Sequence, residues 1–463
     1  MSDPNHMSAM EAMMWHIESD PWLAPNGGGI TIYDRPLDWD LYRRSIAYAV
    51  SRVPRLRQRV AGGMAPISTP RWVPDHEFDL DWHLRRISAP GDGSLRGLLD
   101  YFTPWMQDGF DRTRPLWNYL VVDGLAEGRG AVLTKMHHTI ADGEAVMEMI
   151  KSYTSFEPDA APPPEVDLDA IIDAEPVEDV GAMATARDAL GQGLKLQGEL
   201  ARRALRGVAT VASSSGRTKA AGDAADLART TTDQMHPAGS TLWAKRSRRR
   251  RAEVLSLDFE RVHDASHQLG GSINDFFLTG AVEAATRYHQ AAGHAPERFH
   301  VTFVVNTRAE GEQALNAFSP VPIELPAAPM RMRDRFSRVH ELVATRRGEV
   351  HGAGPLSTLA TVANLIPTSI LTSVAREQSA HIDFATSNLP GFPVDSWVAG
   401  AKTLHSYPFG PPAGTAFNLT MLSMGPCLDV GLHLDPAAID DPELLVSLLE
   451  DAYADLIDEA RRG

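Results

Sequence analysis

The spacing of apolar residues along the chain follows two periods, and each period predicts one kind of element. Alternating or short apolar runs predict strands at residues 27–34, 78–87, 252–259, 300–308, 381–387, 414–424 and 427–434, and a pair joined by a glycine-rich turn at 116–138. Spacings of three and four predict helices at residues 38–61, 94–108, 184–212, 258–270, 273–290, 331–350 and 356–375. Because strands and helices alternate in both halves, we expect an α/β protein with mixed sheets.

Local signals predict where several helices begin and end. Ser8 and Glu11 have the spacing of a capping box in front of the short helix "AMMWHIES". Pro54 ends or kinks the helix that precedes it, because proline lacks the backbone N–H that helix needs. Gly270 ends another helix, and Pro442 occupies the first position of the last one.

The chain of 463 residues suits two domains. The stretch "EPDAAPPPEVDLDAIIDAEPVEDV" is acidic and rich in proline and alanine, as linkers are. We therefore predict an N-terminal domain at 1–160, a linker with an amphipathic helix at 161–240, and a C-terminal domain at 241–463.

Composition narrows the class of protein. The formal net charge of −16 argues against nucleic acid as a partner. A single cysteine, Cys427, cannot form an internal disulfide, so we expect a reducing, cytoplasmic location. The first twenty residues lack a basic segment followed by an apolar one, so no signal peptide is expected. No apolar run approaches the length of a transmembrane helix.

The segment "TKMHHTIADGEAVMEMI" (134–150) contains the most specific chemical signal. If the preceding apolar run is a strand, His137 and His138 point to opposite faces, so only one can work in a cleft. The same geometry disfavours a metal pair. Gly143 lets the backbone reverse tightly after Asp142, because glycine adopts left-handed conformations easily. The Asp142 carboxylate either orients an imidazole or pairs with a distant arginine.

This segment and four others together resemble a known family. "HHTIADG" matches the His-His-x-x-x-Asp-Gly signature of CoA-dependent acyltransferases and nonribosomal condensation domains. "RPLW" (114–117), "GGSINDFFL" (270–278), "VVNTR" (304–308) and "SNLPGFP" (387–393) resemble, in order, motifs of bacterial wax ester synthase/diacylglycerol acyltransferases. The resemblance implies two chloramphenicol-acetyltransferase-like mixed-sheet domains with the active site at their interface. The chain departs from the family pattern at Phe276-Phe277 and at Thr307, which bears on the acceptor pocket more than on the chemistry.

The resemblance also implies roles for the residues of the signature. His138, as the second histidine, is the expected general base, since a neutral imidazole suits proton transfer near pH 7. His137 is expected to support it. Asp142 is expected to pair with Arg308 across the domain seam; a solvated strand-end charge is the alternative for Arg308. No Gly-x-Ser-x-Gly segment indicates an acyl-enzyme, so the expected reaction is direct transfer.

Other residues are expected to contact substrate, each with a structural alternative. Asn274 either hydrogen-bonds the thioester or caps its helix. Pro115, Leu116 and Trp117 either wall the acceptor pocket or belong to the core. Ser387 and Asn388 resemble a turn near the site. Arg248, Arg249, Arg250 and Arg251 either bind phosphates of CoA or anionic lipid, or are a solvated charge run.

We therefore expect an O-acyltransferase that transfers a fatty acyl group from acyl-CoA to a lipid alcohol or diacylglycerol. No cofactor is expected, because acyl-CoA is a co-substrate. Peripheral contact with the inner membrane or lipid droplets is an added expectation. The rival hypotheses are a condensation-type or carrier-dependent acyltransferase and a noncatalytic lipid-binding protein with the same fold.

Overall fold

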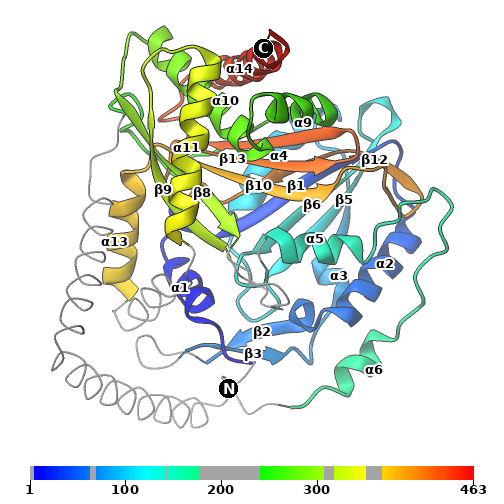
Figure 1. The fold of residues 1–463 in the computed structure, drawn as a ribbon. Helices are drawn as coiled ribbons and strands as arrows, with labels where there is room; N and C mark the ends of the chain where they lie inside the picture. The colour runs from blue at the N-terminus through cyan, green and yellow to red at the C-terminus, as the bar shows by residue number, and fades with distance from the viewer. Residues whose placement is uncertain are drawn as a thin grey trace, which may run out of the picture.

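The computed structural model describes residues 5–62, 69–141, 143–177, 240–306, 318–350 and 368–462. Within them the strands form two six-stranded sheets and one two-stranded sheet, with helices packed on their outer faces (Figure 1). This arrangement confirms the predicted α/β class. The predicted helix at 184–212 and most of that at 356–375 lie outside the described residues.

The first sheet contains six strands in the spatial order β11 (Trp397–Val398), β12 (Ala401–Phe409), β1 (Asn26–Tyr33), β6 (Gly130–His137), β5 (Trp117–Asp123) and β4 (Leu84–Ser88). All its neighbours are antiparallel except β4 and β5. The hairpin of β5 and β6 is the predicted strand pair. Antiparallel pairing with β1 brings the end of β6 beside the start of β1.

Two strands of this sheet come from the far end of the sequence. β12 pairs with β1 so that Ile30 lies opposite Tyr407 and Ile32 opposite His405. The chain therefore crosses from the second half into the first sheet and returns, and β12 also contacts strands of the second sheet. The predicted boundaries at residues 160 and 240 stay a prediction, but residues 401–409 lie in the first sheet and not in the second.

The second sheet has the spatial order β7 (Arg251–Asp258), β14 (Cys427–Leu434), β13 (Phe417–Met424), β10 (Phe384–Phe392), β8 (Arg298–Asn306) and β9 (Phe318–Pro326). β9 was not predicted. Its prolines at 320, 322 and 326 cannot donate to a sheet ladder and obscure the strand pattern, but β9 is an edge strand, where proline is tolerated.

Four helices cover the second sheet together: α9 (Phe259–Gln268), α10 (Ile273–Ala291), α11 (Met332–Val350) and α14 (Pro442–Arg462) (Figure 1). Phe276 and Phe277 are each 1% exposed and stack on Tyr453 of α14, with ring centroids 5.8 and 6.1 Å away. Gly280 leaves room for the same ring. The two phenylalanines are therefore core residues of the second half.

The remaining helices are α1 (Ala9–Ile17), α2 (Trp39–Arg52), α3 (Leu80–His83), α4 (Leu95–Gln107), α5 (Gly143–Lys151), α6 (Leu168–Asp173) and α13 (Thr368–Ala380). Short 3-10 turns occupy Pro54–Arg57 and Ala126–Gly128, and β2 (Gln58–Ala61) pairs with β3 (Arg71–Pro74). No helix in the described part of the chain is both long and apolar enough to cross a membrane.

Several predicted helix ends are confirmed, and one predicted strand is wrong in its first half. Ser8 and Glu11 form the capping box of α1, and α2 ends before Pro54. Residues 80–83 form the short helix α3 because the Asp79 carboxylate caps it, so β4 begins only at Leu84. The capping hydrogen bond overrides the alternation of apolar residues there.

Candidate active site

β6 carries the histidine pair to the place where the two halves of the chain meet. β6 ends at His137, opposite Asn26 of β1, and the His138 N–H donates to the Pro25 carbonyl at 3.0 Å. The backbone of both histidines is therefore fixed by its neighbours. The His137 N–H donates to the Leu116 carbonyl at 3.0 Å.

His137 is fully buried and held as a neutral ring. Its Nδ1 accepts a hydrogen bond from the Thr139 N–H at 3.1 Å, which leaves the ring hydrogen on Nε2, 3.7 Å from a Glu18 carboxylate oxygen. Burial, followed by the charges of His138 and Arg112, lowers the pKa of His137 to about 3. The rings of Trp15 and Phe110 approach it edge-on. This geometry suits the expected supporting role.

His138 is half-buried, and its ring lies against a glycine of β1. A Cβ atom added to Gly27 would lie 3.3 Å from His138 Nε2, 3.6 Å from Cδ2 and 3.9 Å from the Phe409 carbonyl oxygen. The imidazole therefore stands where β6, β1 and the incoming strand β12 meet. The two histidines point to different surroundings, as the alternation of a strand predicts.

The closeness of Gly27 to the ring gives a specific prediction. Gly27→Ala places a methyl group against Nε2 and is expected to lower kcat by a few-fold to about 10-fold, because the ring must shift by a few tenths of an ångström and a shift of about 1 Å costs roughly 100-fold. Steady-state kinetics and a thermal melt measure the two effects. We expect the melting temperature to change little, since no positive φ is present at this position. Unchanged kcat would show that the ring and the glycine are not functionally coupled.

The helix that follows the signature packs against the second sheet. Met147 of α5 is buried in a small cluster with Leu422 and Met424 of β13, and Leu389 of β10 packs on it. On the other side, the Gly410 N–H, just past β12, donates to Thr420 Oγ1 of β13 at 3.2 Å. The helix after the histidine pair and the residue after β12 thus both contact β13 of the second sheet.

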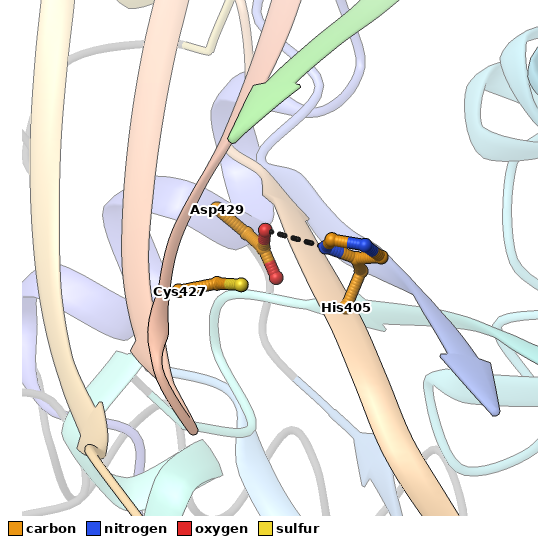
Figure 2. A group of neighbouring side chains, drawn as sticks. All are labelled: His405, Cys427 and Asp429. Carbon is orange, nitrogen blue, oxygen red and sulfur yellow. Dashed lines mark hydrogen bonds and ion pairs between the residues drawn. The ribbon is translucent and has the colours of Figure 1, made fainter. Parts of the chain in front are cut away.

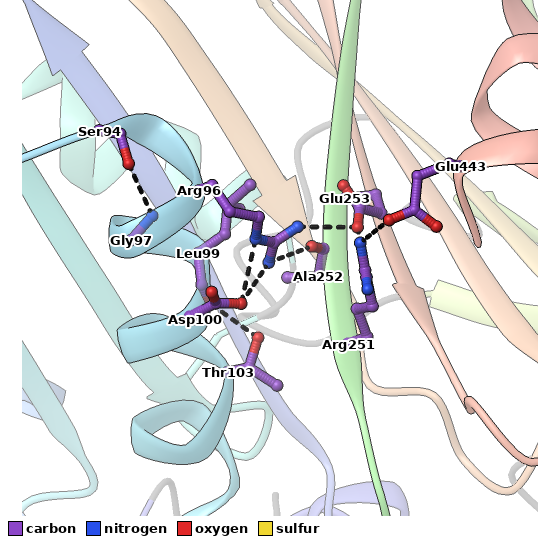
Figure 3. Close-up of polar contacts among 10 residues, drawn as sticks. All are labelled: Ser94, Arg96, Gly97, Leu99, Asp100, Thr103, Arg251, Ala252, Glu253 and Glu443. Carbon is purple, nitrogen blue, oxygen red and sulfur yellow. Dashed lines mark hydrogen bonds and ion pairs between the residues drawn. The ribbon is translucent and has the colours of Figure 1, made fainter. Parts of the chain in front are cut away.

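A polar clamp also joins the two halves (Figure 3). Arg96 of α4 binds Glu253 of β7 at 2.7 Å and the Ala252 carbonyl at 3.1 Å. Arg251 pairs with Glu253 and with Glu443 of α14. These contacts connect a helix of the first half with a strand and a helix of the second.

The four arginines of the basic run do not share one environment. Arg250 is only 4% exposed at its side chain and lies 3.7 Å from Asp435, while Arg251 belongs to the clamp. Arg248 and Arg249 are exposed. Two of the four side chains are therefore engaged within the fold, and CoA-phosphate binding stays a prediction for the run.

Pro115, Leu116 and Trp117 are all buried, as the core alternative describes. The Trp117 indole N–H donates to the Leu56 carbonyl at 2.7 Å, and its ring stacks on His83. Leu116 nevertheless touches the signature through its hydrogen bond with His137. Contact of these residues with an acceptor stays a prediction.

Asn274 lies in the first turn of α10 but does not cap it. Ser272 accepts from the Asp275 N–H, and the Asp275 carboxylate bonds back to the Ser272 N–H, so these two residues form the cap. The Asn274 Nδ2 is buried without a hydrogen-bond partner among the described residues. It therefore has a donor available for a ligand.

Ser387 and Asn388 lie in strand β10, so the expectation of a turn is wrong. They pair in parallel with Thr420 and Met421 of β13, and the register becomes irregular only between Leu389 and Phe392. The Pro-Gly pair falls in that irregular part, where the Gly391 N–H donates to Ser423 Oγ at 2.9 Å. Asp142 and Arg308 lie outside the described residues, and Gly143 begins α5.

A cavity of about 790 Å³ that the sequence did not indicate lies beside α4, with Trp82, Trp105 and Lys135 among its lining residues. Lys135 Nζ donates to the carbonyls of Trp105 and Asp108 at 3.0 and 3.1 Å, and burial lowers its pKa to about 8. His138 does not line this cavity. A lysine two residues before His137 in an apolar strand is the one signal that could have drawn attention to it.

Buried histidines make the stability of the protein depend on pH. Burial lowers the pKa of His137 to about 3 and that of His83, His289 and His433 to about 4. The unfolded chain therefore takes up these protons first, near pH 6.5, and stability falls as the pH drops below that value. Each histidine contributes a slope of about 1.4 kcal/mol per pH unit between pH 6.5 and 4.

Urea unfolding at pH 7 and pH 5 measures this slope in a range where most carboxylates stay ionised. His83→Phe keeps an aromatic ring between Phe78 and Trp117. It is expected to reduce the slope of the unfolding free energy by about 1.4 kcal/mol per pH unit, the contribution of one bound proton. Equal free energies of unfolding at the two pH values would contradict the assignment of neutral buried rings.

Two mixed sheets with the histidine pair between β6 and β1 have the architecture expected of a chloramphenicol-acetyltransferase-like fold. Residues 7–277 match the wax ester synthase/diacylglycerol acyltransferase catalytic domain, and residues 315–457 match the WS/DGAT C-terminal domain. The chain belongs to this family and is an acyltransferase.

Relatives and solved structures agree with this assignment. A putative diacylglycerol O-acyltransferase of Mycobacterium tuberculosis H37Rv is 30% identical and aligns over 98% of this chain and 92% of its own. A probable diacylglycerol O-acyltransferase, tgs1, of the same strain is 24% identical over 99% and 97%. Wax ester synthase/diacylglycerol acyltransferase from Marinobacter aquaeolei VT8 superposes with a TM-score of 0.64 at 19% identity, covering 98% and 99%. The first condensation domain of the calcium-dependent antibiotic synthetase gives 0.59 at 17% identity, covering 99% and 96%, and shares the fold.

Proposed function

We propose that this enzyme transfers a fatty acyl group from acyl-CoA to the hydroxyl of a lipid alcohol or diacylglycerol, giving a wax ester or triacylglycerol. Membership of the family and the names of its relatives support this substrate class. The observation that carries the proposal is the position of the His138 ring at the junction of β6, β1 and β12. An imidazole at a seam between two sheets can be reached by two substrates from different sides.

In this mechanism His138 is the general base. Its Nε2 takes the proton of the acceptor hydroxyl as the oxygen attacks the thioester carbonyl, a bond forms between that oxygen and the acyl carbon, and the carbon–sulfur bond breaks. The imidazolium then returns the proton to the CoA thiolate. Proton transfer of this kind contributes about 10²–10⁴ in rate. His137 braces the strand end, and Asp142 and Arg308 form the structural pair that fixes the seam.

We assign substrate contacts to residues from both halves. The free Nδ2 of Asn274 donates to the thioester or its pantetheine arm, and Ser387 and Asn388 on β10 line the path of the acyl chain. Arg248 and Arg249 meet the phosphates of CoA. Asn274→Ala is then expected to raise KM for acyl-CoA without loss of stability, because it removes a buried donor that has no protein partner. Unchanged kinetics would remove this residue from the site.

We also propose that the cytoplasmic enzyme contacts membranes or lipid droplets peripherally through an apolar surface. Phe156 and Val394 are 42% and 52% exposed, and the Phe156 ring lies 5.2 Å from that of Phe392. Phe392 also packs on the cluster of α5 and β13 behind the signature. Flotation with vesicles of zwitterionic phospholipid and diacylglycerol should be reduced in Phe156→Ser/Val394→Ser. Equal flotation of the double variant would rule out this surface.

Product analysis tests the function itself. A long-chain acyl-CoA is supplied with long-chain alcohols, monoacylglycerols and diacylglycerols in turn, and the esters are separated and identified. Ester formation from free acyl-CoA supports the proposal. Ester or amide formation only from a carrier-bound thioester would favour a condensation-type enzyme, and lipid binding without any product would favour a noncatalytic protein.

A further inference from the structure

A second group of reactive side chains lies where β12 of the first sheet meets β14 of the second. His405 of β12 meets Cys427 and Asp429 of β14, and one nitrogen, the sulfur and one oxygen all lie within 4.8 Å of one another (Figure 2). Cys427 and Asp429 are two apart on β14 and so share a face of that strand. Nothing in the acyl-transfer mechanism uses any of the three.

The carboxylate of this group is buried and held in place by hydrogen bonds. Asp429 is 0% exposed; one oxygen accepts from Ser256 Oγ at 2.6 Å and from His405 Nδ1 at 3.0 Å, and the other accepts from the Ser406 N–H at 2.6 Å. His405 and Cys427 are partly exposed, so the group can be reached from solvent. Ligands held by such outer hydrogen bonds are typical of metal sites in proteins.

The geometry points to a site for Zn²⁺, with His405 Nδ1, Cys427 Sγ and a carboxylate oxygen of Asp429 as ligands and water in the fourth position, and we propose this site. Donors about 2.0–2.3 Å from a tetrahedral ion lie roughly 3.3–3.7 Å apart. His405 and Asp429 are already near that spacing at 3.0 Å, and because all three atoms lie within 4.8 Å of one another, the thiol moves by about 1 Å at most. Imidazole with thiolate selects Zn²⁺ over Mg²⁺ or Ca²⁺.

Binding of the ion releases one proton and moves a second proton between the nitrogens of His405. The thiol releases its proton to solvent, and the hydrogen on His405 Nδ1 moves to Nε2, so that the nitrogen lone pair and the thiolate face the ion. Burial and the nearby Asp429 and Asp258 carboxylates raise the pKa of the Cys427 thiol. Cys427 is the single cysteine of the sequence, which makes its chemistry easy to follow.

The position of the site suggests what the ion does. β14 belongs to the second sheet and β12 to the first, so a bound ion links the two sheets. Four residues beyond His405 on β12 is Phe409, whose carbonyl lies near Gly27, the glycine that also borders the His138 ring. Zn²⁺ at this site would therefore fix the strand that borders the proposed catalytic base.

Cobalt substitution tests the site directly. The untagged full chain is stripped with a chelator and titrated with Co²⁺, and we expect one equivalent to produce the near-ultraviolet absorption of a cobalt–thiolate bond. Cys427→Ser is expected to lose this absorption, and Ser256→Ala to weaken binding by about 10–100-fold. The matched control His263→Ala, an exposed histidine on α9, is expected to bind normally. Absence of the absorption in the wild type, or its survival in Cys427→Ser, would overturn the proposal.

Alkylation supplies a second test, whose decisive measurement is made on the wild-type chain. Zn²⁺, but not Mg²⁺, is expected to slow the reaction of Cys427 with iodoacetamide and to raise the melting temperature. His405→Ala should react at the same rate with and without Zn²⁺. No protection of the wild-type thiol at stoichiometric Zn²⁺ would also overturn the site, whatever the outcome of the acyltransferase assays.

Discussion

His138→Ala is expected to lower kcat for ester formation by about 10²–10⁴-fold, the range that a positioned general base contributes. The fold should persist, because the ring lies at a strand end against Gly27 and its backbone hydrogen bond to Pro25 does not need the side chain. Single-turnover and steady-state assays with acyl-CoA and a long-chain alcohol measure the loss, and a thermal melt reports the fold.

Two comparisons sharpen this experiment. His263→Ala removes an exposed histidine of α9 and should leave kcat unchanged. Added imidazole should restore part of the activity of His138→Ala, because the space beside Gly27 can admit a small base. A fully active His138→Ala enzyme would refute the assignment of the base, and a His138→Ala enzyme with a much lower melting temperature would instead indicate a structural role.

Gly431→Ala is expected to destabilise the protein by about 3 kcal/mol or more, since overpacking at a rigid contact has costs of this order. A Cβ at this position of β14 would overlap the Pro408 backbone on β12. It would lie 2.9 Å from the carbonyl carbon and closer still to the carbonyl oxygen, which is less than a van der Waals contact. Backbone cannot move aside as a side chain can, so the two strands must separate. For a chain of 463 residues the melting temperature should fall by roughly 3 °C or more.

β12 also borders Gly27, which lies against the His138 ring. The fraction of Gly431→Ala protein that stays folded should therefore have a reduced kcat. Gly348→Ala is the matched control: it lies in α11 with no atom within 4 Å of the added carbon, and should be as stable as the wild type or slightly more so. Wild-type stability of Gly431→Ala would mean that β12 and β14 do not approach as closely as described.

The seam between the two halves, where β12 lies between β1 of the first sheet and β14 of the second, most distinguishes the molecule from two separate domains. β12 leaves the second half, pairs with β1 and is held to the second sheet by Asp429, which accepts from the Ser406 N–H. The Arg96–Glu253 clamp joins the halves at α4. His138, the proposed base, belongs to the first half, but the strand β12 beside it comes from the second half of the sequence.

Elements whose stability is local were predicted well. The capping box at Ser8 and Glu11, the end of α2 before Pro54 and the β5–β6 hairpin all follow from residues a few positions apart. Where a local hydrogen bond competed with the hydrophobic pattern, as at the Asp79 cap, the pattern was misleading. The alternation at β6 correctly separated the surroundings of His137 and His138.

β12 was missed because its partners are distant in sequence. Ala401 packs in one core of the first half while Tyr407 and Phe409 pack in another, so its apolar residues do not follow one period. The polar residues between them are satisfied by distant groups, such as Asp429 for His405 and Thr31 for Ser406. Nothing within the segment itself indicates that these partners exist.

The sequence by itself determined the chemical type of this protein through a resemblance: its histidine signature and ordered companion motifs match those of an acyltransferase family. It also determined strand ends, turns and helix caps, because residues a few positions apart encode these directly. Only the tertiary structure decided which residues surround the histidine, that Gly27 lies against its ring and beside the Phe409 carbonyl, and that His405, Cys427 and Asp429 gather between β12 and β14. Contacts between segments hundreds of residues apart depend on how the two sheets pack. The spacing of apolar residues within one segment does not predict that packing.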